Sequence, residues 1–313
     1  MLRRLLIVLF AVWAGVATMA PADAAGVVFP LGSRIGLEPA GDLTLSSQFP
    51  GFVDAQRHVA VSILDLPGAA YDEITRSAFA DNQQGLTNIK REGFLFTGGM
   101  GFLVTADAQI NGATVHRWFM AASPAAISVP NQAMLVRVEV PDAARSVYTD
   151  AVVRKMLASV TFRQPPIEEL LGLLPFKVND LAGFRVSKVV PNGVIVTDGP
   201  TDDVVHQAYM IITARPGGPS SPDDRARFAR DLLAEAPVKE LRVTSGDQIR
   251  IGGQPGMEIR ADALNPSGEK IALVQWIRFA PNGFIRIVGV APKDKWDAVF
   301  NRFRALRDGL TPR

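Results

Sequence analysis

The sequence predicts an α+β protein of two tandem modules, each an antiparallel sheet flanked by helices. Two observations lead to this fold class. The same landmarks recur in the same order in the two halves of the chain, as expected for an internal repeat. Strand-like stretches also alternate apolar and polar residues, which is typical of antiparallel sheets with one buried face.

The clearest repeated segment is a glycine turn that leads into a strand. It occupies residues 98–107 in the first half and residues 252–262 in the second, and both copies end in aspartate. The other paired landmarks are Pro30 with Pro175, Trp118 with Trp276, and Pro141 with Pro292. The shared order indicates that one fold occurs twice.

In the first module we expect strands at residues 57–64, 88–96, 101–105, 113–121 and 133–140, with helices at 70–83 and 146–160. The last strand alternates most clearly, because Val136 and Val138 share a face while Arg137 points the other way. The closing helix is predicted by apolar residues at every fourth position, including Tyr148 and Met156.

In the second module we expect strands at residues 194–197, 208–214, 248–251, 257–261, 270–279 and 284–290. Ser221 followed by Pro222 and two aspartates predicts a helix start, because serine caps a helix and proline favours its first turn. A final helix is predicted from Trp296 onward, with Phe300 and Phe303 facing the core.

Residues 1–25 have the three parts of a cleavable secretory signal. Arg3 and Arg4 precede an apolar run, and small residues allow cleavage near Ala24 or Ala25. The alternative is an uncleaved anchor, but the run is shorter than the roughly 20 residues that span a bilayer. We therefore expect a periplasmic or secreted protein without stable membrane insertion after cleavage.

After the signal at residues 1–25, we predict a first module at 26–164, a linker at 165–174 and a second module at 175–313. The linker is apolar between its prolines, so we expect it to pack between the modules and hold them as a rigid pair. The chain contains no cysteine, which excludes a disulfide framework and a lipoprotein anchor. Its net charge of +2 gives no indication of nucleic-acid binding.

Each module reads as an early hairpin, a helix, a glycine-rich turn entering a strand meander, and a closing helix. The residues that carry this order are Pro30 and Pro175, segments 98–107 and 252–262, and the closing-helix ends at 159–162 and 303–306. The order resembles the PsbP/Mog1-like fold over nearly all of the chain after the signal. That fold includes photosystem assembly factors, a nuclear-transport regulator and many exported bacterial proteins. The resemblance implies a binding or assembly role and transfers no functional residue.

The motif search yields no catalytic constellation. His58, His116 and His206 lack metal-binding spacing, and we expect them to be surface or satisfied sheet residues. There is no Gly-x-Ser-x-Gly segment, and the glycine turn at 98–101 precedes a strand rather than the helix that a phosphate loop needs. We predict no cofactor, no catalytic residue and no metal site.

Two groups of residues are candidates for a ligand or partner face. Trp118 and Trp276 could line a groove, although core packing under the helices is the simpler interpretation. Asp198, Asp202 and Asp203 place three carboxylates on one turn, which could bind calcium but lacks the EF-hand pattern, so a solvated hairpin tip is simpler. The first half shows no counterpart of this acidic turn.

The sequence thus predicts a periplasmic, non-enzymatic binding or assembly protein with an unknown protein or cell-envelope partner. Two alternatives stay open. One is a small-molecule carrier with an enclosed apolar cavity between the modules, and the other is an enzyme with a site of carboxylates and arginines between the modules.

Overall fold

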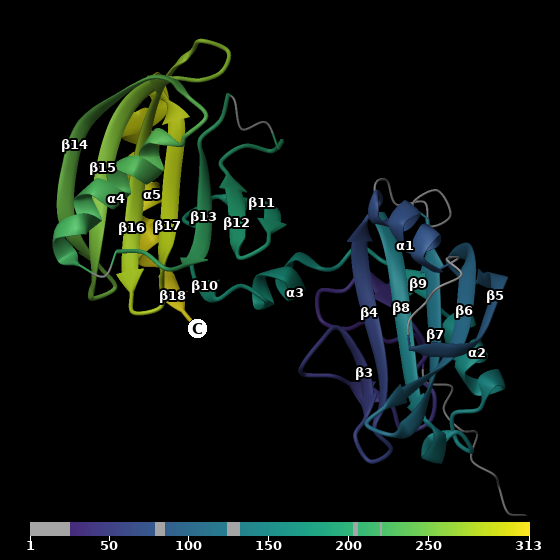
Figure 1. Cartoon of the computed structure of the whole chain (residues 1–313). Helices are drawn as coiled ribbons and strands as arrows, with labels where there is room; N and C mark the ends of the chain where they lie inside the picture. The colour runs from purple at the N-terminus through teal and green to yellow at the C-terminus, as the bar shows by residue number, and fades with distance from the viewer. Residues whose placement is uncertain (1–25, 79–84, 124–131, 203–205, 220) are drawn as a thin grey trace, which may run out of the picture. The chain divides into compact units, whose positions relative to one another are not determined.

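The computed structural model describes residues 26–78, 85–123, 132–202, 206–219 and 221–313 (Figure 1). The predicted signal therefore lies outside the described residues. Contacts divide the chain into two compact units. Among the described residues, the first contains residues 26–30 and those of Ile35–Phe162, and the second contains those of Leu31–Arg34 and Arg163–Arg313. No helix in the described part of the chain is long and apolar enough to cross a membrane.

The first unit is built on an antiparallel sheet with the strand order β2-β3-β4-β8-β7-β6-β5 among the described residues. The strands are β2 (Thr44–Leu45), β3 (Gly51–Asp54), β4 (Val59–Pro67), β5 (Leu86–Phe96), β6 (Gly99–Ile110), β7 (Ala113–Ala122) and β8 (Gln132–Pro141). Helix α1 (Ala70–Ala78) follows β4, and η1 (Asp142–Ala144) and α2 (Asp150–Ala158) follow β8.

The second unit has the strand order β11-β12-β13-β17-β16-β15-β14 over its described part. The strands are β11 (Arg185–Val190), β12 (Gly193–Thr197), β13 (Tyr209–Pro216), β14 (Lys239–Ile251), β15 (Gln254–Leu264), β16 (Lys270–Ala280) and β17 (Gly283–Pro292). The helical segments are α3 (Ile167–Gly172), η2 (Pro222–Asp224), α4 (Arg225–Ala234), η3 (Lys293–Lys295) and α5 (Trp296–Asp308).

The two strand orders are the same once β2 is matched with β11 and the remaining strands follow in sequence. Each unit also ties its first segment to its last by a short antiparallel ribbon. In the first unit β1 (Ile35–Gly36) pairs with β9 (Thr161–Phe162), and in the second β10 (Phe176–Val178) pairs with β18 (Leu310–Pro312). The predicted fold class, two tandem α+β modules, is confirmed.

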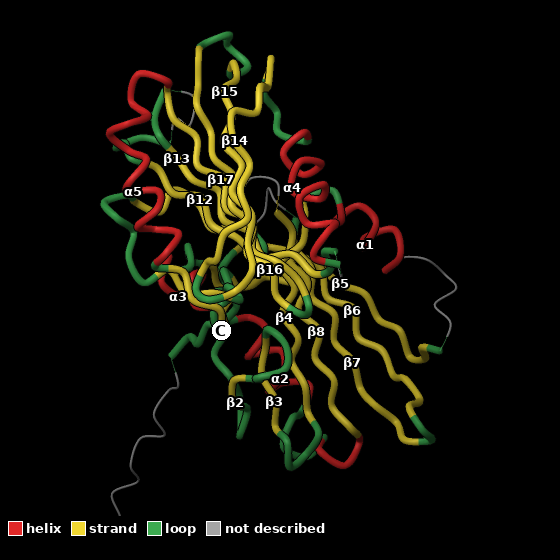
Figure 2. The backbone as a smooth tube through the Cα atoms, turned by 90° about the vertical axis from the view of Figure 1, so that its left-hand side faces the viewer, coloured by secondary structure: helices red, strands yellow, loops and turns green. Residues whose placement is uncertain are grey.

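Each sheet carries its closing helix on one face and its inner helix on the other. In the first module, α2 packs Val153 and Leu157 on one core, while Ile74 of α1 packs on the opposite face against Phe102. In the second module α5 and α4 take the same places, and Figure 2 shows them on opposite sides of the sheet. Two-sided coverage explains why the central strands are rich in valine and isoleucine.

The two sheets can be aligned by counting back along β8 from Pro141 and along β17 from Pro292, the prolines that end these strands. Residues paired with the same position in this count are matched between the modules. By this count Gly101 matches Gly256, in agreement with the repeated glycine turn. A Cβ on Gly101 would lie 2.1 Å from the carbonyl oxygen of Ala121, and one on Gly256 would lie 2.8 Å from that of Ile277. Both glycines therefore let the neighbouring strand approach closely.

The same count corrects the pairing of the tryptophans. Trp118 lies opposite Val138, three residues before the closing proline, because 141 minus 138 is 3. Trp276 lies opposite Ile287, five residues before it, because 292 minus 287 is 5. Trp118 and Trp276 therefore share a face but occupy ladder positions two residues apart, and the sequence pairing of the two was wrong.

The structure changes the bounds of several predicted elements. Strand β14 begins at Lys239 rather than at residue 248, because a half-exposed edge strand carries little apolar alternation. It contains two register shifts, between Lys239 and Arg242 and between Val243 and Ser245. Helix α2 begins later than residue 146, since the Thr149 side chain caps it by accepting a bond from the backbone N–H of Val152.

We expect Gly101→Ala to lower the unfolding free energy of the first module by about 1–3 kcal/mol, because the added methyl collides with a neighbouring carbonyl. Gly93→Ala on the adjacent strand β5 is the matched control, since a Cβ there meets nothing within 4 Å. Urea unfolding followed through the indole resonance of Trp118 measures both variants. Equal stabilities for the two would contradict the close approach.

Candidate functional site

A hollow of about 390 Å³ opens on the α4 face of the second sheet. Its floor consists of alternate residues of β13, β17 and β16, all on one face of the sheet. Tyr209 lies opposite Val290, and Ile211 opposite Val288. Leu273 of β16 continues the floor beside Val290. The residues from Glu235 to Val238, which connect α4 to β14, form one wall.

The hollow exists because α4 covers only part of its face. In Figure 1 α4 lies in front of β15 and β16, whereas β13 has no helix in front of it. Tyr209, Ile211 and Val288 are consequently half-buried, although they occupy the middle of the sheet. Apolar central residues left without a covering helix make this face able to take an apolar ligand.

Two arginines and one glutamate provide the charged groups of the hollow: Arg215, Arg286 and Glu235. Arg286 is held in place, since its Nε donates to Oε1 of Gln275 at 2.8 Å and a terminal nitrogen donates to the carbonyl of Leu232 at 2.7 Å. Burial lowers the pKa of Arg286, and the nearby Arg215 lowers it further against the opposing effect of Glu235.

Tyr209 adds one neutral polar group to the floor. Burial raises the pKa of its phenol above the ordinary value, so the hydroxyl stays protonated and can donate a hydrogen bond. Within the described residues no hydrogen bond engages this hydroxyl.

The first module has a more open hollow, of about 460 Å³, on its α1 face. Ile74, Phe102, Phe119 and Leu135 are among its lining residues, and Glu73 is the charged member of that lining. The same side of the two sheets thus carries an apolar depression in each module. The arginine pair, however, belongs to the second module.

The two candidate tryptophans lie in the core beneath the closing helices. Trp118 is 5% exposed and its indole N–H donates to Asp150 at 2.9 Å. Trp276 is fully buried and donates to Glu258 at 2.7 Å. Glu258 is in turn bound by Arg260 at 2.6 Å. Both indoles are therefore satisfied by carboxylates, which is the usual arrangement for a buried tryptophan.

The acidic turn is paired with arginines. Asp198 accepts from Arg302 of α5 at 2.6 Å, and Asp202 accepts from Arg185 at 2.8 Å and from Ser187 at 2.9 Å. Asp203, the third candidate, lies outside the described residues. The described residues contain no group of three acidic or histidine side chains placed to hold a metal ion.

The ladder reveals a counterpart of Asp198 in the first module, contrary to the sequence interpretation. Asp54 lies opposite Val59, and Asp198 donates its backbone N–H to Ala208. Val59 and Ala208 occupy the same position relative to the closing prolines. Sequence comparison missed this match because the hairpin turns between these strands differ in length.

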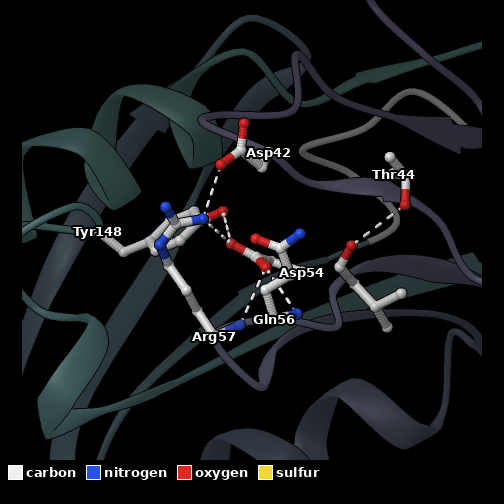
Figure 3. Close-up of polar contacts among 7 residues, drawn as sticks. Asp42, Thr44, Asp54, Gln56, Arg57 and Tyr148 are labelled. Atoms are coloured by element: carbon white, nitrogen blue, oxygen red, sulfur yellow. Dashed lines mark hydrogen bonds and ion pairs between the residues drawn. The ribbon is translucent and has the colours of Figure 1, made fainter.

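Asp54 anchors the buried network drawn in Figure 3. One carboxylate oxygen accepts the backbone N–H groups of Gln56 and Arg57, at 3.1 and 3.0 Å. The other accepts from the Tyr148 hydroxyl and from the Arg57 guanidinium, both at 2.9 Å. Arg57 also reaches Asp42 at 2.6 Å. Each module thus binds a hairpin aspartate through a residue of its closing segment, Tyr148 here and Arg302 in the second copy.

The hydrogen bonds drawn in Figure 3 shift the pKa values of Asp54 and Tyr148. Burial alone would raise the pKa of Asp54, but the hydrogen bonds from Arg57 and Tyr148 outweigh it and hold the pKa below 3.8. Burial and the bond to Asp54 raise the pKa of Tyr148 to about 12. These shifts accompany a closed set of hydrogen bonds, so we interpret the network as structural.

His116 is also a satisfied sheet residue, as the sequence predicts. Its Nδ1 lies 2.6 Å from Asp107 and its Nε2 lies 3.0 Å from Asp142. In the second module the residue matched with Asp107, Asp262, binds Lys293 directly. In both modules this aspartate is linked to the residue after the closing proline, through His116 to Asp142 in the first and directly to Lys293 in the second.

The hollow escaped the sequence analysis, although part of its pattern is visible there. Tyr209, Ile211, Thr213 and Arg215 alternate along one strand with the fully buried Met210 and Ile212. The alternation shows that this face changes from apolar to cationic along the strand. It does not show that α4 leaves the face uncovered.

No family model matches the chain, and no curated protein matches it. Single modules resemble solved structures of LpqN from Mycobacterium tuberculosis, "involved in cell envelope biogenesis", at 12% identity over 44% of this chain and 82% of that one, TM-score 0.37. Cyanobacterial PsbP from Synechocystis matches at 14% over 42% and 82%, TM-score 0.29. Yeast Mog1p, a Ran-binding protein, matches at 13% over 40% and 77%, TM-score 0.28.

Both modules together resemble the Pseudomonas aeruginosa immunity protein TplEi, at 10% identity over 93% of this chain and 98% of that one, TM-score 0.30. These findings confirm a weak PsbP/Mog1-like resemblance. At this level the matches transfer no function.

We expect Asp54→Asn to destabilise the first module at pH 7 and to have little effect at low pH. The folded-state pKa of Asp54 lies below 3.8, so its contribution is present above that pH and is lost as the pH falls through the folded value. Urea unfolding over a series of pH values from 7 downward, followed through the Trp118 indole resonance, measures how the effect declines. Asp72→Asn on α1 is the exposed control, and a pH-independent Asp54 effect would refute the linkage.

Proposed function

We propose that this chain is an exported, non-enzymatic binding protein whose ligand inserts an apolar part into the hollow of the second module. The observation that carries the proposal is the partly uncovered floor formed by Tyr209, Ile211 and Val288. Apolar sheet residues left open to solvent are costly, at roughly 25 cal/mol for each Å² of apolar surface. A ligand that covers them recovers that free energy.

The polar groups of the hollow favour binding over catalysis. Acid–base chemistry by a carboxylate pair needs two carboxylates near one another. Among the described lining residues of the hollow, Glu235 is the one residue with a carboxylate. Arg286 is engaged by Gln275 and Leu232, so it is positioned to attract a ligand and not to exchange protons. A hollow of this size with few polar groups fits a small-molecule site.

Export is part of the proposal and rests on residues 1–25. An arginine pair, an apolar run and small residues before Gly26 support cleavage by a signal peptidase. The absence of cysteine agrees with a folded state that needs no disulfide in an oxidising compartment. We place the mature protein in the periplasm, where a cell-envelope ligand would be encountered.

Fractionation of a Gram-negative host that expresses the full chain tests this export. We expect the periplasmic fraction to contain a protein whose N-terminal residue is Ala25 or Gly26, because cleavage follows small residues. A substitution of Leu9 by Arg should retain the precursor, since a charge interrupts the apolar run. Full-length protein in the cytoplasm, with Met1 present, would contradict the proposal.

Binding of Nile red, a neutral dye that fluoresces in apolar surroundings, tests the hollow. We expect Val288→Asp to weaken dye binding by roughly tenfold or more, because a buried carboxylate opposes apolar contact. Leu135→Asp makes the same change in the hollow of the first module and is the matched control.

Circular dichroism checks the folding of both variants, and Ile211→Ser replaces Val288→Asp if the latter does not fold. Unchanged binding in the second-module variants would refute the assignment. Loss of binding in Leu135→Asp alone would transfer the site to the first module.

A further inference from the structure

We propose that the ligand of the hollow is an amphiphile with one anionic head group, which Arg215 and Arg286 bind while its apolar chain lies along β13 and β17. This inference rests on the proposed function and adds the chemical class of the ligand. It also fixes the direction in which the ligand lies.

The register of the sheet places the two guanidinium groups at the same end of the hollow. Arg286 lies opposite Thr213, and Arg215 is two residues further along β13, opposite Phe284. Arg215 and Arg286 are therefore diagonal neighbours on one face, about 7–8 Å apart at the backbone. An oxyanion between them can accept from both side chains.

The opposite end of the floor is apolar. From Arg215 the same face of β13 runs through Ile211 to Tyr209, a distance of about 20 Å at the usual rise per residue. Val288 and Val290 accompany it on β17, and Ile271 lies at the far end on β16. A molecule that is charged at one end and apolar along its length matches this gradient.

The charge balance of the hollow favours an anion. Arg215 and Arg286 carry two positive charges, and Glu235 carries one negative charge, so the lining retains one net positive charge. Within the described residues the guanidinium of Arg215 makes no hydrogen bond or ion pair. The lowered pKa of Arg286 agrees with this, because burial and the charge of Arg215 both act against its protonated state.

Arg286 also stabilises the wall of the hollow, so it is not the residue to substitute in a test of charge. Its bond to the carbonyl of Leu232 ties the sheet to the last turn of α4. Removing Arg286 would therefore disturb the wall of the hollow as well as the charge. Arg215 is exposed, so Arg215→Gln removes one charge without breaking a bond within the described structure.

Four probes with alkyl chains of nine or ten carbons separate the contributions: decanoate, decyl phosphate, decanol and decyltrimethylammonium, each competing with Nile red on the chain without residues 1–25. We expect both anions to bind roughly tenfold more tightly than decanol, and the cation to bind most weakly. Arg215→Gln should weaken the anions by about tenfold and leave decanol unchanged. Arg304→Gln, an exposed arginine on α5, is the matched control.

Raising the salt concentration should weaken the anions in the wild type and have less effect in Arg215→Gln. Tighter binding of decanoate than of decyl phosphate indicates a fatty-acid carboxylate, and the reverse indicates a phosphate monoester; either order supports the inference. Equal affinities for decanol and the anions, or equal losses in Arg215→Gln and Arg304→Gln, would overturn it. The proposed function would then stand if Val288→Asp still weakened Nile red binding by roughly tenfold or more, and would fall with the inference otherwise.

Discussion

Coverage of the sheet faces is the constraint on which the rest of this structure depends. Each module forms a sheet whose central strands are apolar on both sides, so each face needs a layer of side chains from elsewhere. The closing helix provides that layer on one face, with Phe303 and Leu306 in the second module. The inner helix is short, with α4 running from Arg225 to Ala234, and leaves one side of the other face open. The hollow is the direct result.

The duplication preserved the backbone and exchanged the chemistry at matched points. Asp54 and Asp198 lie at the same ladder position and are each bound from the closing segment, but by a phenol in one module and a guanidinium in the other. Asp107 and Asp262 likewise hold the segment after the last strand through His116 and Lys293. The side chains that bind these aspartates differ between the modules, while the strand order is the same. The fold therefore tolerates a change of the donor residue as long as some donor still reaches the aspartate. The arginine pair of the hollow is one more such difference between the copies.

The sequence was sufficient for the architecture and insufficient for the site. Alternation along residues 133–140 and the proline at each closing helix are local signals, and local patterns determine strands and helix ends. The first part of β14, from Lys239 to residue 247, was missed because exposed edge positions carry no apolar period. The hollow depends on where α4 ends and how far it reaches across the sheet, which is a tertiary property. Trp118 and Trp276 were conspicuous in the sequence because of their residue type, whereas Tyr209 and Arg215 were not.

The register shifts of β14 also affect how the protein behaves at high concentration. An edge strand of this length offers a row of backbone donors and acceptors to any other unpaired strand, which is a common start of aggregation. Here two irregularities interrupt the row, and Lys239, Arg242 and Arg250 place charges along it. A strand of a second molecule could not form a continuous hydrogen-bonded ladder with β14 unless its own register shifted at the same two places. The two register shifts and the charges therefore protect this edge against pairing with another strand.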